Sequence, residues 1–211
     1  MYEKELFNMW ADNYDNDVKL YEESSSYPFA GYKSNLNRIF NLVMKKKYSR
    51  VLDIGFGTAV LTSKLYENNH DITGIDFSER MLEIGQKKMP SASLYLSDFR
   101  KGITNKIKSR FDFVLLTYSI HHLSFTEKVK LLRELKNYLN EDGLIIIGDV
   151  LFETSSDLSK SKEKHSRIWD DEEFYIVIEE LTEEISNDYQ VSYHIETHCS
   201  GVVILRRLAQ T

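Results

Sequence analysis

The sequence predicts a doubly wound α/β protein, with a mostly parallel sheet of about seven strands and an antiparallel C-terminal hairpin strand. Between residues 34 and 149, short apolar runs alternate five times with helical patterns, as in a parallel sheet with helical crossovers. The last of these runs, residues 144–152, is almost continuously apolar, which is typical of a strand covered on both faces. Two β-rich runs then lie on either side of Ser200-Gly201, a pattern that predicts a hairpin.

The other expected strands are short runs rich in β-branched and aromatic residues. They cover residues 50–55, 71–76, 93–98 and 111–118 before the fifth strand, and residues 191–199 and 201–208 in the hairpin. In a doubly wound sheet, ligands bind beyond the carboxyl ends of the strands. We therefore expect the functional residues to follow these strands directly.

Helices are expected between the strands. Ser34 is a suitable N-cap for an apolar stripe that runs to Met44, and Ser78 caps a second helix. The segment Ser124-Phe125-Thr126-Glu127 has the pattern of a capping box. Residues 171–185 place apolar residues on one stripe and acids on the other face, which predicts a further amphipathic helix.

Length and composition indicate one folded domain over residues 1–211. Hydrophobic residues make up 42% of the 211 residues and charged residues 28%, values that exclude a disordered chain. Within this domain we expect residues 1–33 to form a lid or cap. Residues 150–170, which begin with a Ser/Lys-rich stretch, are expected to form a mobile insertion.

The chain lacks the marks of a secreted or membrane protein. A single cysteine, Cys199, excludes a disulfide framework, and no apolar run approaches the roughly 20 residues that span a bilayer. The first ten residues are acidic and aromatic, unlike a secretory signal. We therefore expect a cytoplasmic protein with no membrane partner.

The net charge of −6 is unevenly distributed. Residues 1–30 carry −5 and residues 170–184 carry −8, which leaves +7 on the rest of the chain. The acidic segments make nucleic acid an unexpected partner. The basic excess is compatible either with an anionic substrate or with solvated helix faces.

A glycine turn after the first strand indicates the kind of ligand. Gly55 and Gly57 follow the strand that ends near Asp53, and glycines allow a backbone to approach a ligand closely. A dinucleotide fingerprint requires a third small residue where this chain has Val60. The Asp53 carboxylate would also repel a pyrophosphate, whereas it suits a cation such as an α-amino group. A nicotinamide cofactor is therefore disfavoured.

Two further carboxylates follow the second and third strands. Asp76 lies 19 residues after Gly57, where a carboxylate can accept hydrogen bonds from both ribose hydroxyls. Asp98 and Phe99 offer a polar acceptor and a flat apolar face for a purine. S-adenosylmethionine has an ammonium group, a ribose and an adenine but no phosphate, and it fits this set.

With these residues the chain resembles the class I S-adenosylmethionine-dependent methyltransferases, from about residue 7 to residue 150. It is similar in particular to small bacterial methyltransferases of unassigned substrate. Those proteins have a W-A-x-x-Y-D segment, here residues 10–15, and an H-H-L segment, here residues 121–123. Ala59 stands where the family often has a third glycine, and we expect a modest effect on the turn.

The resemblance implies a Rossmann-like fold and a set of cofactor-binding residues. These are Tyr14, Asp53, Gly55, Phe56, Gly57, Thr58, Asp76, Phe77, Asp98, Phe99 and Thr117. Tyr14 and Trp10 lie on the N-terminal segment, which either closes over the site as a lid or packs against the sheet. In a lid, the tyrosine would face the sulfonium, because aromatic rings attract cations.

The acceptor side of the site is less defined. We expect Tyr32, Tyr118, His121 and His122 to contact the substrate. His122 is the candidate general base, and a structural turn with one histidine bound to the backbone is the alternative. Two adjacent histidines also suggest a metal, but no third ligand accompanies them at a recognisable spacing, so no metal site is expected.

The sequence thus predicts an S-adenosylmethionine-dependent methyltransferase that acts on a small molecule, as a monomer or homodimer. An RNA methyltransferase and a catalytically idle S-adenosylmethionine-binding protein remain alternatives. The RNA enzyme would need a basic face continuous with the site. The idle protein would produce no S-adenosylhomocysteine when supplied with cell metabolites.

Overall fold

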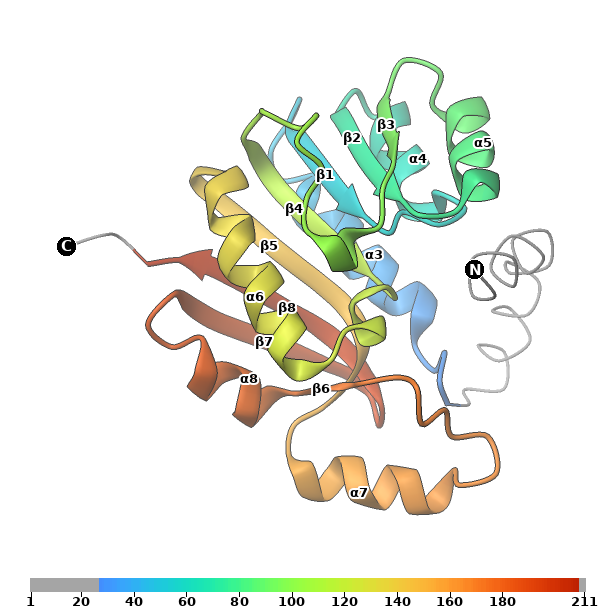
Figure 1. Cartoon of the computed structure of the whole chain (residues 1–211), viewed down its shortest axis with the longest axis vertical. Helices are drawn as coiled ribbons and strands as arrows, with labels where there is room; N and C mark the ends of the chain where they lie inside the picture. The colour runs from blue at the N-terminus through green and yellow to red at the C-terminus, as the bar shows by residue number, and fades with distance from the viewer. Residues whose placement is uncertain (1–26, 209–211) are drawn as a thin grey trace.

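The protein forms one twisted sheet with helices on both faces (Figure 1). The computed structural model describes residues 27–208. The main strand order is β3-β2-β1-β4-β5-β8-β7, and an eighth strand, β6, pairs with β5. The predicted fold class is therefore confirmed. Among residues 27–208, no helix has the length and apolar character needed to cross a membrane.

The first five strands are parallel and lie close to the predicted positions. They are β1 (Arg50–Ile54), β2 (Asp71–Asp76), β3 (Ser93–Leu96), β4 (Phe111–Thr117) and β5 (Leu139–Phe152). The hairpin strands β7 (Tyr189–Thr197) and β8 (Ser200–Arg207) are antiparallel, and β8 pairs with β5. The sequence did not predict the two-residue strand β6 (Ile176–Val177), which pairs with the end of β5.

The strand order reverses between β1 and β4. From β1 the chain moves to β2 and β3 on one side, and then returns to β4 and β5 on the other. The loops after β1 and β4 therefore leave the sheet in opposite directions. Such a switch point leaves a crevice at the carboxyl ends of the two strands, where ligands bind.

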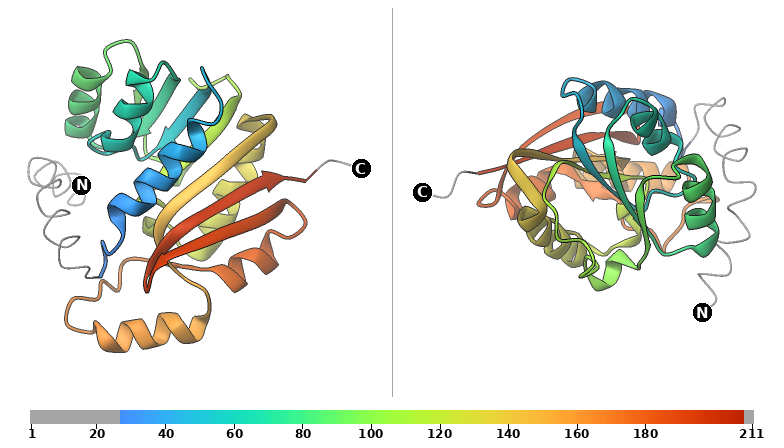
Figure 2. Two further views of the ribbon diagram at one scale, coloured as in Figure 1. Left: turned by 180° about the vertical axis from the view of Figure 1, so that it is seen from behind. Right: turned by 90° about the horizontal axis from the view of Figure 1, so that it is seen from above.

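Helices cover the two faces of the sheet in separate groups. The helices α3 (Tyr32–Val43), α4 (Val60–Glu67) and α5 (Glu79–Lys88) pack on one face. The helices α6 (Phe125–Leu135) and α8 (Ile178–Glu184) pack on the other. Figure 2 shows α3 crossing the face that is hidden in Figure 1. Because side chains alternate along a strand, Val51 belongs to the α3 core and Leu52 to the α6 core.

Two predicted helix starts are confirmed by their capping bonds. The Ser78 side chain accepts from the Met81 backbone N–H at the start of α5. At the start of α6, Ser124 and Glu127 form both bonds of the predicted capping box. These starts are local in origin, since each depends on residues three apart in the sequence.

Three predicted elements differ from the structure. Helix α3 begins at Tyr32 after a left-handed Gly31, so Ser34 lies inside the helix. The apolar stripe over residues 171–185 is divided, because its first part pairs with β5 as β6 before α8 begins. Within residues 150–170, which were expected to form a mobile insertion, residues 150–152 belong to β5, in agreement with the strand predicted over 144–152. The helix α7 (Ser155–Lys164), which was not predicted, follows. The Thr154 side chain caps α7 by accepting from the Asp157 N–H.

A close contact between α3 and β5 can be tested by a double-mutant cycle. A Cβ at Gly148 would lie 2.6 Å from Ile39 Cδ1, so Gly148→Ala should lower the free energy of unfolding by about 1–3 kcal/mol. Ile39→Val removes that methyl and alone should cost about 0.5–1.5 kcal/mol. In urea unfolding, the double variant should lose less than the two single variants together. Additive losses would show that this contact does not determine the spacing of α3 and β5.

Candidate active site

The loop between β1 and α4 makes a tight left-handed turn. Gly55 and Gly57 have φ values of 72° and 55°, a region that favours glycine. A Cβ at Gly55 would lie 2.7 Å from Ser119 Cβ, so this glycine is required by close packing. A Cβ at Gly57 would meet nothing within 4 Å. The space beside Gly57 is therefore empty of protein atoms and open to a ligand.

Ala59 continues the same turn with a side chain. Its φ of 58° is left-handed, and it is the N-cap residue of α4. This conformation costs an alanine roughly 1–2 kcal/mol, which explains why a glycine suits the position. The Ala59 side chain is buried against the α3 core, and this burial offsets part of the strain.

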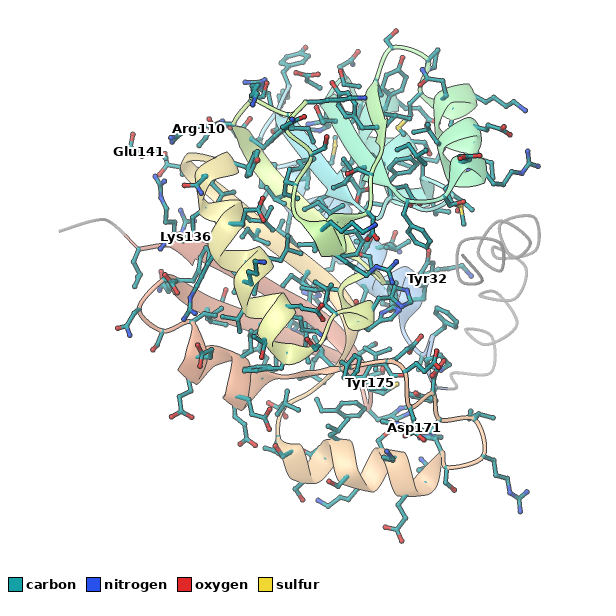
Figure 3. The ribbon with its side chains drawn as sticks, viewed as in Figure 1. Tyr32, Arg110, Lys136, Glu141, Asp171 and Tyr175 are labelled. Atoms are coloured by element: carbon teal, nitrogen blue, oxygen red, sulfur yellow. The ribbon has the colours of Figure 1, made fainter. Side chains whose placement is uncertain are left out.

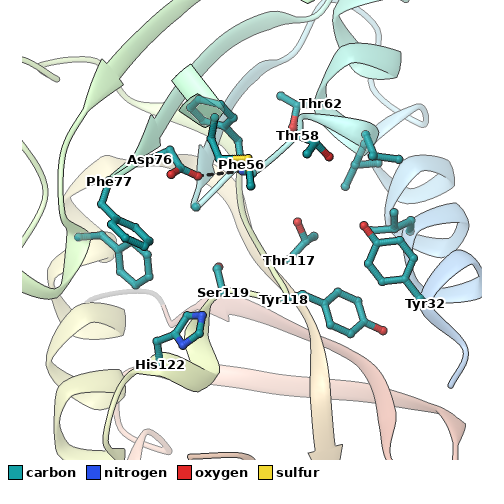
Figure 4. Close-up of a pocket in the computed structure, with 17 residues that line it drawn as sticks. Tyr32, Phe56, Thr58, Thr62, Asp76, Phe77, Thr117, Tyr118, Ser119 and His122 are labelled. Carbon is teal, nitrogen blue, oxygen red and sulfur yellow. Dashed lines mark hydrogen bonds between the residues drawn. The ribbon is translucent and has the colours of Figure 1, made fainter. Parts of the chain in front are cut away.

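An open pocket of about 680 Å³ lies at the carboxyl ends of β1, β2 and β4. This volume includes open solvent at the mouth of the pocket. Figure 4 shows Asp76 and Phe77 on one side and Tyr32 from α3 on the other. The lining consists of Tyr32, Leu36, Gly55, Phe56, Gly57, Thr58, Val60, Leu61, Thr62, Asp76, Phe77, Met81, Phe99, Thr117, Tyr118, Ser119 and His122.

Asp76 joins two of the loops that form the pocket. Its Oδ2 accepts from the Gly57 N–H at 2.9 Å, and its Oδ1 accepts from the Ser78 N–H at 2.9 Å. Burial raises the pKa of Asp76 to about 6, although these backbone bonds oppose the shift. A carboxylate has about four lone-pair sites, so the three backbone bonds from Gly57, Phe77 and Ser78 leave an acceptor position on Asp76 for a ligand.

Asp53 lies beneath the glycine turn and does not line the pocket. Thr62 donates a hydrogen bond to Asp53 Oδ2, while the buried Oδ1 has no protein partner. Burial raises the pKa of Asp53 to about 7, although the Thr62 hydroxyl favours the charged form. A cationic ligand group near this oxygen would favour ionisation.

The phenylalanines on the Asp76 side of the pocket differ in what they contact. The Phe56 ring packs where Cβ atoms of Gly74 and Gly85 would lie, 2.8 Å from its nearest carbons, and so anchors the turn between β2 and α5. Phe77 and Phe99 also line the pocket. Asp98, which was predicted beside Phe99, does not. Its Oδ1 accepts from Arg100 Nε at 2.9 Å, and it caps the 3₁₀ turn η1 (Phe99–Lys101).

Two tyrosines form the opposite wall. The rings of Tyr32 and Tyr118 have centroids 4.7 Å apart, and Asn35 Nδ2 donates to Tyr118 Oη at 2.9 Å. Tyr118 has a φ of 48°, which is an uncommon conformation for a bulky residue. The turn directs the chain from β4 into Ser119, whose hydroxyl donates to the Ile54 carbonyl. The crevice thus separates β1 from an aromatic wall.

The two histidines of η2 (Ile120–His122) have different surroundings. His122 lines the pocket, and burial and the adjacent His121 lower its pKa to about 3. His121 is buried and does not line the pocket. Burial opposes its charge, but Asp149 and Glu173 raise the pKa of His121. The predicted role of His122 in general-base catalysis stays a prediction.

Most of the predicted cofactor and acceptor residues meet at this pocket. Of those in residues 27–208, only Asp53, Asp98 and His121 are not part of its lining. Tyr14 and Trp10, and with them the predicted lid, lie outside the described residues. Sequence reasoning missed Leu36, Val60, Leu61, Thr62, Met81 and Ser119. From the sequence, Leu36 and Met81 could be predicted only as core residues, because an apolar stripe on a helix does not reveal which of its residues contact a ligand.

Solved structures share this fold at low sequence identity. A DhpI–S-adenosylhomocysteine complex matches with a TM-score of 0.71 and 15% identity, over 97% of this chain and 94% of that one. The magnesium protoporphyrin IX methyltransferase of Synechocystis PCC 6803, with bound S-adenosylhomocysteine, matches with a TM-score of 0.66 and 14% identity, over 85% of each chain.

Sequence comparison identifies the family. Residues 51–143 match the family described as a methyltransferase domain. An uncharacterized methyltransferase YrrT of Halobacillus halophilus is 32% identical over 199 residues, which cover 90% of each chain. One from Alkaliphilus oremlandii is 32% identical over 150 residues, 71% of this chain and 68% of its own. The chain belongs to the class I S-adenosylmethionine-dependent methyltransferases.

The buried state of Asp53 predicts a pH dependence of stability. Its folded pKa of about 7 lies above the ordinary 3.8, so the folded protein retains a proton that the unfolded chain releases. This contribution to stability is complete below pH 4 and is lost as the pH rises through 7. Asp53→Asn cannot ionise. The free energy of unfolding of the parent should therefore fall by about 2 kcal/mol between pH 5 and 7 as Asp53 ionises, whereas that of Asp53→Asn should not show this fall.

Urea unfolding of both proteins at several pH values measures this difference. Asp71→Asn is the matched control, because Asp71 is exposed at the opposite end of β2. A difference between Asp53→Asn and the parent that stays constant with pH would contradict the buried, protonated state.

Proposed function

We propose that this pocket binds S-adenosylmethionine and positions its methyl group for transfer to a small-molecule acceptor. The observation that carries the proposal is the open space over Gly57 beside the Asp76 carboxylate. A ribose placed there would donate a hydroxyl to the acceptor position that Asp76 does not use for backbone bonds. Phe77 and Phe99 would flank the adenine.

The methionine part of the cofactor then extends toward Asp53. The unpartnered Oδ1 of Asp53 lies beneath the turn, where a nearby ammonium group would stabilise the ionised carboxylate. Thr58 and Thr117 line the same end of the pocket. This orientation would direct the sulfonium toward the end of β4, between the glycine turn and the tyrosine wall.

The chain's part in the reaction is to orient and desolvate the reactants. The cofactor supplies the electrophilic methyl group, and alignment with the acceptor lowers the barrier. Tyr32 and Tyr118 offer aromatic faces, which attract a sulfonium cation, and His122 borders the same space. The acidic segment over residues 170–184 argues against a nucleic-acid acceptor and so favours a small molecule.

The cofactor is tested by the thermal stability of the protein with candidate ligands. S-adenosylhomocysteine at 100 times its Kd should stabilise the folded protein by about 2.7 kcal/mol and raise Tm by several degrees, because it binds only that state. NAD and NADP should leave Tm unchanged, since Asp53 and Val60 disfavour a pyrophosphate at the turn. A shift with NAD and none with S-adenosylhomocysteine would refute the proposal.

The role of Asp76 is tested by substitution. Hydrogen bonds to a charged group are worth about 1.5–3 kcal/mol, so Asp76→Ala should weaken S-adenosylhomocysteine binding about tenfold to a hundredfold in calorimetry. Asp71→Ala is the control, since Asp71 lies at the other end of the same strand. The Tm of each ligand-free protein separates damage to the loop from loss of the ribose contact. Unchanged affinity in a folded Asp76→Ala protein would remove the ribose assignment.

A further inference from the structure

We propose that His121, His122 and Glu173 form a binding site for a divalent transition-metal ion beside the cofactor pocket. The histidines come from η2, directly after β4. Glu173 comes from the segment between α7 and β6, the region of Tyr175 in Figure 3. One ligand atom from each residue lies within 4.8 Å of the others. The sequence showed no third ligand because Glu173 is far from the histidines along the chain.

The spacing is close to what a metal ion requires. His121 Nε2 and Glu173 Oε1 are 3.6 Å apart. Zinc bonds to nitrogen and oxygen are about 2.0–2.2 Å long, which places tetrahedral ligand atoms roughly 3.4 Å from one another. This pair therefore already has the required separation. The ligand atoms all lie within 4.8 Å of one another, so the widest pair would close by at most about 1.4 Å, which side-chain rotation can provide.

Carboxylate and hydroxyl partners orient two of the three ligands. His121 Nδ1 lies 2.7 Å from the buried Asp149 Oδ1, and an ionised carboxylate can only accept. In the neutral imidazole that binds a metal, the ring proton therefore belongs on Nδ1 and the lone pair on Nε2, which lies 3.6 Å from Glu173 Oε1. Tyr175 Oη donates to Glu173 Oε2 at 2.6 Å, which leaves Oε1 for the ion. Histidine ligands of metals characteristically have such a carboxylate behind them.

The backbone ties the two ligand-bearing segments together. The Phe174 N–H donates to the His121 carbonyl at 2.8 Å. The buried Lys128 ammonium donates to the carbonyls of both Leu123 and Phe174. These bonds fix Glu173 against η2 without using any of the three ligand side chains. The two segments that carry the ligands are thus held together by backbone and Lys128 hydrogen bonds, independently of the ion pair between His121 and Glu173.

The donor set also indicates the class of ion. Two imidazoles and one carboxylate suit zinc, iron or manganese, and three protein ligands leave at least one position for another molecule.

The position of His122 connects this site with methyl transfer, and this step rests on the function proposed above. Because His122 also lines the pocket, the ion would hold an oxygen-bearing acceptor beside the methyl group. A bound ion lowers the pKa of a hydroxyl, and the O–H proton leaves to solvent. The oxygen then bonds to the methyl carbon while the C–S bond breaks with its electron pair on sulfur, giving a methyl ether and S-adenosylhomocysteine.

Cobalt(II) titration of chelator-treated protein without a histidine tag tests the site. Visible absorption and calorimetry should show one ion per chain bound through imidazole, with zinc competing for it. Glu173→Gln should weaken binding at least tenfold, and His122→Gln should do the same. Glu172→Gln is the matched control, because Glu172 is the exposed neighbour of Glu173 and is not one of the three ligands. Asp149→Asn should weaken binding about 10- to 100-fold by releasing the His121 ring.

The result that overturns the proposal is equal cobalt affinity in Glu173→Gln and Glu172→Gln, or no stoichiometric binding by the parent. Circular dichroism identifies a variant that fails to fold. If Glu173→Gln does not fold, the cobalt affinity of His122→Gln, at a partly exposed position, decides whether the site exists. S-adenosylhomocysteine affinity of the chelated protein keeps the two proposals apart. Cofactor binding without cobalt binding refutes only the metal site, whereas cobalt binding without cofactor binding refutes the proposed function and leaves the metal site standing.

Discussion

The pocket depends on one hydrogen bond between neighbouring loops, from the Gly57 N–H to the Asp76 carboxylate. The chain leaves β1 through left-handed residues, which are intrinsically unfavourable unless other contacts hold them. Asp76 supplies such a contact from the end of the adjacent strand and also accepts from Ser78. One carboxylate therefore fixes the turn, the start of the loop before α5, and the space above Gly57.

The parallel register of the sheet makes this bond possible. Asp53 pairs with Gly74 and Ile54 with Ile75 in the register of β1 and β2, so both strands end at the same level. Because Gly74 and Gly85 have no Cβ, there is room for the Phe56 ring, which anchors the same turn from below. Packing in the core and geometry at the site are thus determined by the same few residues.

The acceptor side follows a different principle, since it is assembled from distant segments. Residues after β4 provide Tyr118 and His122, α3 provides Tyr32, and the segment after α7 brings Glu173 against His121. Some buried polar groups in this region pair with one another, as His121 does with Asp149, whereas Asp149 Oδ2 and Asn35 Oδ1 have no hydrogen-bond partner.

The sequence alone determined the elements whose signals are local. The strands up to β5, the caps at Ser78 and Ser124, and the residues of the glycine turn could be predicted because each depends on a few adjacent residues. The divided stripe at residues 171–185 and the helix α7 could not, since pairing with β5 decides where α8 begins. Only the tertiary structure turned His121 away from the pocket and brought Glu173 to the histidines, because such contacts join residues that only folding brings together.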